Sequence, residues 1–435
     1  MVVHCARRSL TIRAAGVRRG ARSRAGLPGG ARQRSYDAQV ITAAPRRRPG
    51  YPAAAAVFAI GMMGTTLPTP LYGLYREEIG FSTFVVTVVF AVYAIGVLAV
   101  LLLAGDYSDR AGRRPVLLAA LALSAASAVC FLSENGLPLL FAGRLLSGFA
   151  AGLLSGTATA TVIELAPPEG RARAAFAATA ANMGGLGCGP LVAGLLAEYA
   201  PHPLALPFLV HLALLVPAAV VVLLLPETVE RPDRRARPRP QGLRVPPGAR
   251  AAFALCAPAA FAGFALLGLF TAVAPTFVAQ TLDVTDHAVA GAIVFSVFLA
   301  STAGQWAAGR LAAERALPRG RLLLVAGLVL VAASLAVESL PLLVVGGALA
   351  GVGQGMAFRA AVATVSAAAP AEQRGATIST LFVVAYCGIS LPVVGVGALT
   401  LWLGLRGAGL VFTACVALTA AAGRRGGDRP RSGPR

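Results

Sequence analysis

Residues 105–114, with the sequence GDYSDRAGRR, place two acids and three arginines between two long apolar stretches that carry no charge. Opposite charges at such short spacing can form ion pairs and can bind to the ends of neighbouring helices. Asp109 is an anion that can stabilise the positive N-terminus of another helix, and Gly112 permits a tight turn. The cluster therefore indicates electrostatic contacts between structural elements rather than a site for substrate.

The other reactive side chains are scattered along the chain. Five of the six cysteines fall within or beside apolar stretches, with no CxxC pair and no metal-ligand spacing. This pattern predicts neither a disulfide framework nor a zinc site. No loop contains the cluster of His, Asp or Cys that an enzyme at a membrane face needs. We therefore expect no enzymatic activity, no cofactor and no metal site.

The composition is that of an all-α polytopic membrane protein. The 435 residues are 57% hydrophobic and 13% charged, whereas a soluble domain is about one quarter charged, and the mean hydropathy is +0.73. Apolar runs of roughly 20 residues, the length that crosses a bilayer, recur along nearly the whole chain. Helices are expected, because open sheet edges cannot exist in hydrocarbon. The twelve predicted transmembrane helices are 53–73, 84–104, 115–133, 139–161, 174–198, 204–225, 252–279, 288–309, 320–338, 342–366, 376–400 and 403–422.

The net charge of +20 reflects membrane topology. All 38 basic residues are arginines, and 34 of them lie before the first predicted helix, after the last, or in alternate loops. Loops with a positive excess face the cytoplasm, so we expect both termini there and no nucleic-acid partner. Arginine without lysine, with abundant Ala and Gly, is typical of a GC-rich bacterial genome. The expected location is therefore the plasma membrane, as a bacterial inner-membrane protein.

An internal repeat relates the two halves of the chain. Residues 137–171 and 340–374 align without gaps with 16 of 35 positions identical, and the matches include Pro167, Glu169 and Arg171. Shared apolar composition does not explain matches of Pro, Glu and Arg in a loop. The fourth helix thus corresponds to the tenth, and six helices are repeated in parallel orientation. Secondary transporters use this architecture, with the substrate bound between the halves near the membrane midplane.

The chain is expected to divide into five parts. Residues 1–50 hold twelve arginines and one acid and cannot build a core, which predicts a disordered Arg-rich cytoplasmic extension. An organelle transit peptide has a similar composition, but we favour a cytoplasmic tail or an upstream translation start. The other parts are an N-terminal six-helix bundle (51–225), a cytoplasmic linker (226–251), a C-terminal six-helix bundle (252–422) and a basic cytoplasmic tail (423–435).

The charged cluster of residues 105–114 has a counterpart in a known family. GDYSDRAGRRP, between the second and third of twelve helices, resembles motif A of the major facilitator superfamily. The resemblance covers about residues 52–422. The matching positions are Gly105, Asp109, Arg110, Gly112, Arg113 and Arg114.

The resemblance implies that this cluster is a conformational latch. In the family, the acid at the position of Asp109 lies at the N-terminus of the eleventh helix, which here starts just after PAEQRGAT. Gly105 allows close approach of a neighbouring helix, and Arg113 can bridge to Glu164 at the end of the fourth. These contacts exist in the state closed to the cytoplasm and break when the halves move apart. Residues 303–320 keep little of the motif, so the latch is expected to be asymmetric.

A second motif lies in the fifth predicted helix. GLGCGPLVAG resembles motif C, associated in the family with drug and metabolite antiporters, with Ala193 where a glycine is more usual. Glycines four apart let helices pack backbone to backbone, and proline bends a helix at its own position. The matching residues are Gly185, Gly189, Pro190 and Gly194.

Two arginines and one histidine lie well inside predicted helices and are candidates for function. Arg144, in RLLSG, resembles the motif B arginine that is implicated in proton coupling in the family. The alternative interpretation is that the Arg144 side chain snorkels to the lipid headgroups, but charged residues within a membrane are usually functional. Arg359 either attracts an anionic or polar substrate group or bonds backbone carbonyls. His211 titrates near neutral pH, although a single histidine on an apolar helix is more often packed. The first helix carries no acid, so Asp106 and Glu164 are the remaining carboxylate candidates for coupling.

Polar side chains within the helices are candidates for a transport cavity. They are Thr65, Thr69, Tyr72, Asn182, Gln354, Arg359 and Tyr386. The leading interpretation is a proton-driven exporter of small amphipathic drugs or metabolites, working as a monomer in the lipid bilayer. An uptake permease for a sugar or another metabolite has the same fold, but motif C and the scarcity of polar residues within the helices disfavour it. A non-transporting sensor needs an attached soluble domain, for which the linker has no room.

Overall fold

The computed structural model describes residues 50–133, 136–233, 235, 237, 239–240 and 242–422. These residues form helices and connecting loops, without a strand among them. The N-terminal half contains α1 (Tyr51–Thr66), η1 (Thr69–Leu71), α2 (Tyr72–Ile79), α3 (Thr83–Ala104), α4 (Tyr107–Ala111), α5 (Arg113–Leu132), α6 (Leu137–Glu164), η2 (Pro168–Gly170), α7 (Arg171–Tyr199) and α8 (Leu206–Leu224). The predicted disorder of residues 1–50 and the basic tail 423–435 lie outside the described residues, except for Gly50.

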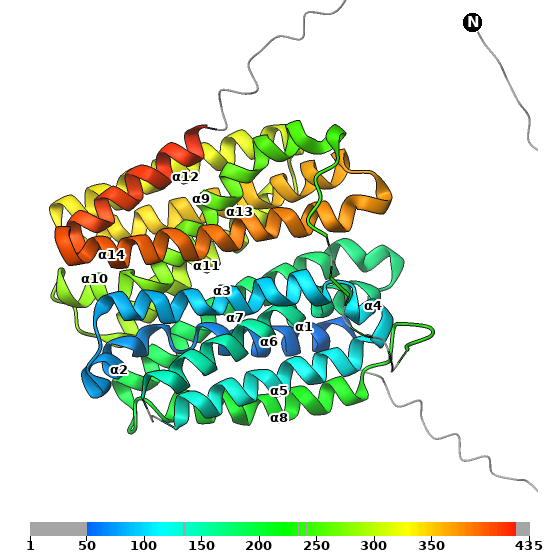
Figure 1. The fold of residues 1–435 in the computed structure, drawn as a ribbon, viewed down its shortest axis with the longest axis horizontal. Helices are drawn as coiled ribbons and strands as arrows, with labels where there is room; N and C mark the ends of the chain where they lie inside the picture. The colour runs from blue at the N-terminus through cyan, green and yellow to red at the C-terminus, as the bar shows by residue number, and fades with distance from the viewer. Residues whose placement is uncertain are drawn as a thin grey trace, which may run out of the picture. The chain divides into compact units, whose positions relative to one another are not determined.

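The C-terminal half follows a linker that contains the described residues from 226 to 246. It contains η3 (Pro247–Ala249), α9 (Arg250–Ala272), α10 (Ala274–Gln280), α11 (His287–Ala308), α12 (Ala313–Val337), α13 (Leu340–Ala368), η4 (Ala371–Gln373) and α14 (Arg374–Ala422). Figure 1 shows these helices as an upper group, above the helices of the N-terminal half.

The described residues contain eleven helical segments long and apolar enough to span a membrane. The last of them, 52 residues from Ala371 to Ala422, is about twice the length that one crossing needs. Its backbone leaves the helical conformation at Gly404, where φ is +68° and ψ is 174°. α14 therefore contains two successive crossings. The predicted fold class, twelve transmembrane helices in two six-helix bundles, is confirmed.

The largest differences from the helices predicted by hydropathy are at the first, seventh and ninth crossings, and the seventh, predicted as one helix over 252–279, is α9 followed by α10. α12 begins at Ala313 rather than at 320, because its first two turns carry Glu314, Arg315 and Arg319 and are too polar to be read as membrane-spanning. The first crossing is not one helix but α1, η1 and α2 in succession. Pro68 and Pro70 interrupt it, since proline lacks the N–H of a helix interior and restricts the residue before it.

The internal repeat is also visible in the packing. α6 packs against α5, α3 and α1, and its counterpart α13 packs against α12, α11 and α9, in the same order of extent. The first crossings of the two halves are the most enclosed, with 72% of the apolar window buried for Tyr51–Ile79 and 67% for Pro247–Ala272. Equivalent helices thus take equivalent places in the two halves.

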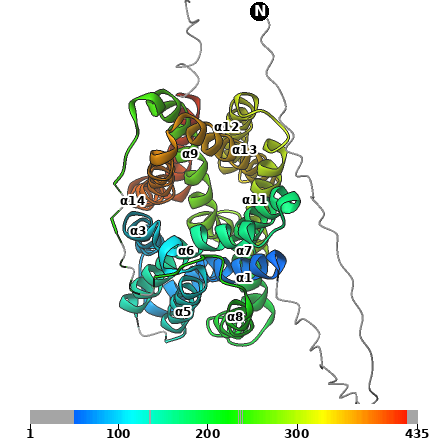
Figure 2. The same ribbon diagram turned by 90° about the vertical axis from the view of Figure 1, so that its right-hand side faces the viewer.

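The two ends of the helices differ in charge. We call the end that carries α4, the linker and η4 the arginine-rich side, which lies on the right in Figure 1. The end that carries α2 and α10 is the arginine-poor side. The halves meet along α3 with α14 and along α7 with α11, and Figure 2 shows both pairs at the boundary between the two groups of helices.

Candidate functional site

Arg113 is the centre of the charged cluster on the arginine-rich side. Its guanidinium is buried and donates to Glu164, with 2.8 Å between Nη2 and Oε1, and to Ser108 Oγ at 2.7 Å. Its Nη1 also pairs with Asp109. The structure therefore brings together the start of α5, the end of α6 and the short helix α4.

The cluster does not reach the C-terminal half in this structure. The Asp109 side chain is 60% exposed and its partner is Arg113, four residues on in its own segment, not the N-terminus of α14. Gly105 is exposed and so makes no close helix contact. The charged side chains of residues 105–114, as far as the chain is described, pair only with the N-terminal half. Among the described residues, Asp109 and Gly105 therefore lack the contacts with a neighbouring helix that the motif predicts.

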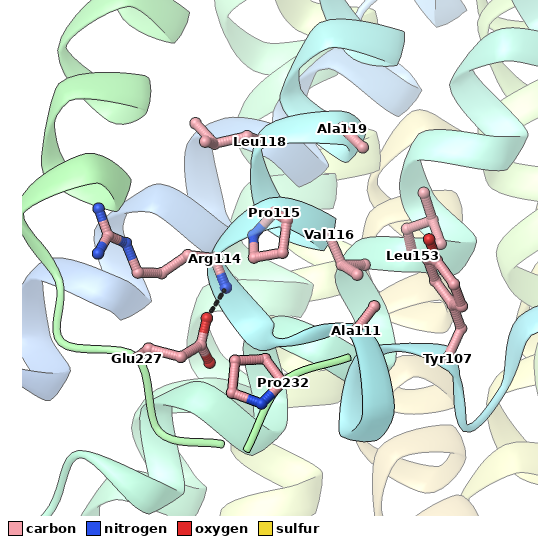
Figure 3. Close-up of a pocket in the computed structure, with 10 residues that line it drawn as sticks. All are labelled: Tyr107, Ala111, Arg114, Pro115, Val116, Leu118, Ala119, Leu153, Glu227 and Pro232. Atoms are coloured by element: carbon pink, nitrogen blue, oxygen red, sulfur yellow. Dashed lines mark hydrogen bonds between the residues drawn. The ribbon is translucent and has the colours of Figure 1, made fainter. Parts of the chain in front are cut away.

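An acid that the motif does not include holds the start of α5. Glu227 accepts hydrogen bonds from the backbone N–H groups of Arg113 at 2.8 Å and Arg114 at 3.1 Å. The adjacent Gly112 has φ +102°, which favours glycine, and a Cβ there would lie 2.9 Å from Glu227 Oε2. Figure 3 shows Glu227 below the start of α5, beside a pocket lined mainly by apolar side chains. The only sequence signal was an acid directly after the sixth predicted helix.

The other charged residues of the segment 105–114 form contacts within the segment, with the linker and with α8. Arg110 pairs with Asp106 at 3.1 Å across one helical turn, and its carbonyl accepts from the N–H of Asp233 in the linker at 2.7 Å. Arg114 donates to the carbonyl of Leu223 at the end of α8. Asp106 therefore belongs to a surface ion pair and does not lie inside the membrane-spanning part.

In α7, Gly185 and Gly189 pack directly against α1. A Cβ at Gly185 would meet the carbonyl oxygen of Ala59, and one at Gly189 would lie 2.5 Å from that of Met63. α7 stays one helix through Pro190. Because Pro190 has no N–H, the Leu186 carbonyl lacks its usual donor, and the Thr66 hydroxyl of α1 donates to it at 2.7 Å.

The opposite face of α7 packs against the C-terminal half. Gly194 lies against the carbonyl of His287, and the carbonyl of Pro190 lies against Gly291, both in α11. α7 is thus close-packed on two sides, with α1 of its own half and with α11 of the other. The glycine spacing indicated a helix contact, and the structure shows that there are two.

The contacts between the halves gather toward the arginine-poor side. His287 Nδ1 lies 3.0 Å from Glu198 Oε2, and the neighbouring Tyr199 hydroxyl lies 3.3 Å from Asp286 Oδ2. Between α3 and α14, a Cβ at Gly397 would meet the side chain of Thr87. The described contacts of residues 105–114 at the other end stay within the N-terminal half, so the two halves are held together at the arginine-poor side. Sequence reasoning missed these pairs, which lie at helix ends without a motif.

Arg144 is enclosed in the middle of the N-terminal half. Its side chain is 1% exposed, so it does not snorkel to the headgroups. Nη1 donates to the backbone carbonyl of Thr65 at 2.6 Å, and Nε donates to the Tyr72 hydroxyl. The guanidinium carbon lies 5.1 Å from the centre of the Tyr72 ring and 5.5 Å from that of Phe90. Its neighbours are thus all uncharged.

The two other predicted ionisable residues have different surroundings. His211 is buried between α8, α5 and α1, with its Nε2 3.0 Å from Ser124 Oγ and its ring against Gly64. These contacts fit a packed histidine better than a proton relay. Arg359 is exposed, and its Nη1 donates to the Gln305 carbonyl at the end of α11 at 3.0 Å. Its carbonyl-bonding role is the one seen here.

The other cavity candidates lie in several places. Tyr386 of α14 faces Tyr93 of α3, with ring centres 6.4 Å apart, so it lies where the halves meet. The Oε1 atom of Gln354 accepts from Ser301 Oγ at 2.6 Å, while its Nε2 has no hydrogen-bond partner among the described residues. Buried oxygens of Thr69 and Asn182 likewise have none there. Thr65 donates to the carbonyl of Met62.

A family comparison matches most of the described chain. The model described as Major Facilitator Superfamily matches residues 54–337, from α1 to the end of α12. Over 128 residues the chain is 36% identical to the class D tetracycline resistance protein of Salmonella ordonez, and over 144 residues it is 33% identical to the class B protein of Escherichia coli. These matches cover 28% and 33% of this chain and 30% and 35% of the relatives. The chain therefore spans about a third of the length of the curated relatives it matches.

Solved structures share the fold at low sequence identity. The human organic anion transporter MFSD10 (TETRAN) superposes with a TM-score of 0.62 and 19% identity, over 87% of this chain and 100% of that chain. A bacterial homolog of the human lysosomal transporter Spinster, in its inward-facing and unoccupied conformation, has a TM-score of 0.62 and 16% identity, over 88% and 98%. At these identities the likeness shows the fold alone.

Proposed function

Because the chain belongs to the Major Facilitator Superfamily, we propose that it is a secondary active transporter that exports small amphipathic drugs or metabolites in exchange for protons. The observation that carries this proposal is the packing of α7, whose glycines seat it against α1 in its own half and α11 in the other. α7 can therefore move together with its own half as a rigid body while its contact with α11 shifts. Alternating access requires such a movement of one half relative to the other.

The conformation supports the same mechanism. The contacts between the halves gather on the arginine-poor side, while the charged cluster on the arginine-rich side has no partner in the C-terminal half among the described residues. The second conformation of the cycle would close the arginine-rich side, with Asp109 at the N-terminus of α14. We propose that this latch stabilises that second state. The transporter is proposed to work as a monomer of two bundles, 51–225 and 252–422.

The proposed orientation places the arginine-rich side in the cytoplasm of a bacterium, according to the positive-inside rule. The state described here is then open to the cytoplasm. We expect a cysteine at Arg239, in the linker, to react with a membrane-impermeant maleimide only in inverted vesicles. A cysteine at His202, on the arginine-poor side, should react only in intact cells. Labelling of the linker in intact cells would contradict the proposed topology.

Export rather than uptake is supported by two features. The similar tetracycline resistance proteins are named for resistance to a drug. Every Asp and Glu of the described membrane-spanning segments lies within two residues of a segment end, which leaves few groups to bind the hydroxyls of a sugar. Uptake of a sugar or another metabolite is the alternative, and transport measured in both directions distinguishes them.

Proton coupling is the part of the proposal that depends on Arg144. The first crossing has no acid in its interior, and His211 is enclosed between helices of one half. An arginine cannot release its own proton in a protein, so it would act by shifting the proton affinity of substrate or water. Its neighbours in this state are uncharged. Substrate or water could therefore become its partner in the second state.

The experiment that tests the function is uptake into inverted vesicles across a panel of acidic, neutral and cationic amphipathic compounds. An inside-acid proton gradient should drive accumulation of at least one compound, and a protonophore should stop it. Matched vesicles without the protein give the background. Accumulation that is the same with and without the gradient would contradict proton-coupled export.

The proposed latch predicts the effect of Asp109→Asn. This change removes the anion that would cap α14 in the second state, a contribution of about 0.3–1 kcal/mol, and up to about 2 kcal/mol when partly buried. Transport should fall several-fold at unchanged protein level. Asp106→Asn is the matched control, because it breaks only the surface pair with Arg110, worth about 0.3–0.5 kcal/mol. Equal transport by the two variants would argue against the latch.

A further inference from the structure

Arg144 is a buried cation in a membrane interior without acids. Its side chain is 1% exposed, and no ion pair to it exists among the described residues. The carboxylates of the described membrane-spanning segments all lie within two residues of a segment end, at the faces of the membrane. An uncompensated charge in such surroundings is costly and marks a functional site. The described residues therefore do not provide a counter-ion.

The hydrogen-bonding capacity of this guanidinium is only partly used. Nη1 is bound by the Thr65 carbonyl at 2.6 Å, and Nε by the Tyr72 hydroxyl. Nη2 is buried and has no hydrogen-bond partner among the described residues. The rings of Tyr72 and Phe90, with centres 5.1 and 5.5 Å from the guanidinium carbon, provide a weak electrostatic substitute for an anion. The Nη2 amino group of Arg144 is thus available to donate hydrogen bonds, and a guanidinium donor is well suited to bind an oxyanion.

Aromatic rings lead from this guanidinium into the C-terminal half. Tyr93 lies one turn after Phe90 in α3, and its ring centre is 6.4 Å from that of Tyr386 in α14. The Tyr386 ring lies 5.7 Å from Phe264 at a steep angle, and Phe264 lies 5.0 Å from Phe358. Aromatic rings attract one another at such distances, so a further aromatic ring could pack against these side chains, either stacked or edge-on.

We infer that Arg144 binds the anionic group of an aromatic organic acid, a carboxylate or phenolate, whose ring packs against Tyr93, Tyr386 and Phe264. The inference rests on the proposed transport function and specifies its substrate class. The charge of the site favours an anion over a cation, and the rings favour a flat aromatic body over a sugar. The rings of Tyr72 and Phe90 lie over the guanidinium in this state, so binding of the acid requires these two rings to move aside.

The test is equilibrium binding to the full-length protein in lipid nanodiscs, with three ligands that share one ring system. They are 2-naphthoate, its neutral amide 2-naphthamide, and the cation 2-naphthylmethylammonium. The acid should bind at least about tenfold more tightly than the amide, because a charge-assisted hydrogen bond is roughly twice as strong as a neutral one. The cation should bind more weakly than the amide.

Variants then assign this preference to one guanidinium. Arg144→Gln should bind acid and amide equally, and Arg144→Lys, which keeps the charge, should retain a reduced preference for the acid. Arg359→Gln, the matched loss of an exposed guanidinium in α13, should keep the preference of the unmodified protein. The inference is overturned if the acid binds no better than the amide, if none of the ligands binds, or if Arg144→Gln keeps the preference.

Vesicle transport separates this inference from the proposed function. Proton-driven export of cations by a protein that does not prefer 2-naphthoate would overturn the substrate class and leave the function standing. Selective, Arg144-dependent binding of 2-naphthoate without proton-driven transport of any compound would overturn the function and leave the site standing.

Discussion

Arg144→Ala is expected to abolish proton-driven transport. The change removes the donors to Thr65 and Tyr72 and leaves a cavity between the Tyr72 and Phe90 rings. A hydrogen bond to a charged group contributes about 1.5–3 kcal/mol, so the loss of two in one state corresponds to a fall in rate of about a hundredfold or more. Arg144→Lys keeps the charge but loses the planar fork of donors. Its transport should lie between that of the alanine variant and that of the unmodified protein.

The measurement for Arg144 is the initial rate of gradient-driven uptake into inverted vesicles, at matched protein level. Thermal stability in detergent is the control for folding, because Ala also removes packing. If the guanidinium acted only in proton coupling, counterflow of substrate without a gradient would be retained while gradient-driven transport fell; a role in binding the substrate would reduce both. A lysine variant with full activity, together with an alanine variant near full activity, would contradict any functional role.

Gly189→Leu is expected to abolish transport by separating α7 from α1. Even a Cβ at this position would meet the Thr66 hydroxyl and would lie 2.5 Å from the carbonyl oxygen of Met63 and 2.9 Å from the backbone nitrogen of Leu67. Backbone atoms cannot rotate away as a side-chain end can. The displaced Thr66 would also stop donating to the Leu186 carbonyl, which Pro190 leaves without its helical donor. Overpacking alone typically costs about 1–3 kcal/mol.

A leucine at Gly184 is the matched control, because a Cβ there meets nothing within 4 Å. It lies on the same helix and adds the same side chain. We expect Gly184→Leu to keep the thermal stability of the unmodified protein, and Gly189→Leu to lose both stability and transport. Transport retained by Gly189→Leu would mean that the contact between α7 and α1 is not needed for the transport cycle.

The fold was largely predictable from the sequence because hydropathy and the repeat are properties of long segments. The repeat that links residues 137–171 with 340–374 indicated equivalent helices, and α6 and α13 have equivalent neighbours. Hydropathy separated the two crossings within α14 at residues 401–402, close to Gly404, where the backbone leaves the helical conformation. It missed the first two turns of α12, because charged residues at a membrane face have the hydropathy of a loop.

Features of the site that depend on the spacing of residues within one segment were predictable from the sequence. Contacts that depend on which other segment packs against it were not. The spacing of Gly185 and Gly189 indicated a close helix contact, but nothing in α7 specifies α1 as the partner. Glu227 caps α5 from a segment more than a hundred residues later, and an acid after a helix has no distinctive pattern. Asp109 differs from expectation for another reason. We propose that its family contact forms in a second conformation, and a sequence does not indicate which state a structure adopts.

The interlocked glycines between the halves also affect how turnover should depend on temperature. Pro190 meets Gly291 and His287 meets Gly194 through backbone atoms, and the short side chain of Thr87 lies against Gly397. Dispersion forces fall off so steeply that a gap of about 0.5–1 Å forfeits a quarter to a half of each contact. The surfaces must therefore separate together before new contacts form. Such a barrier is mainly enthalpic, so opening of the arginine-poor side should slow sharply on cooling, which an Arrhenius plot of exchange rates in a bilayer kept fluid would reveal as a steep slope.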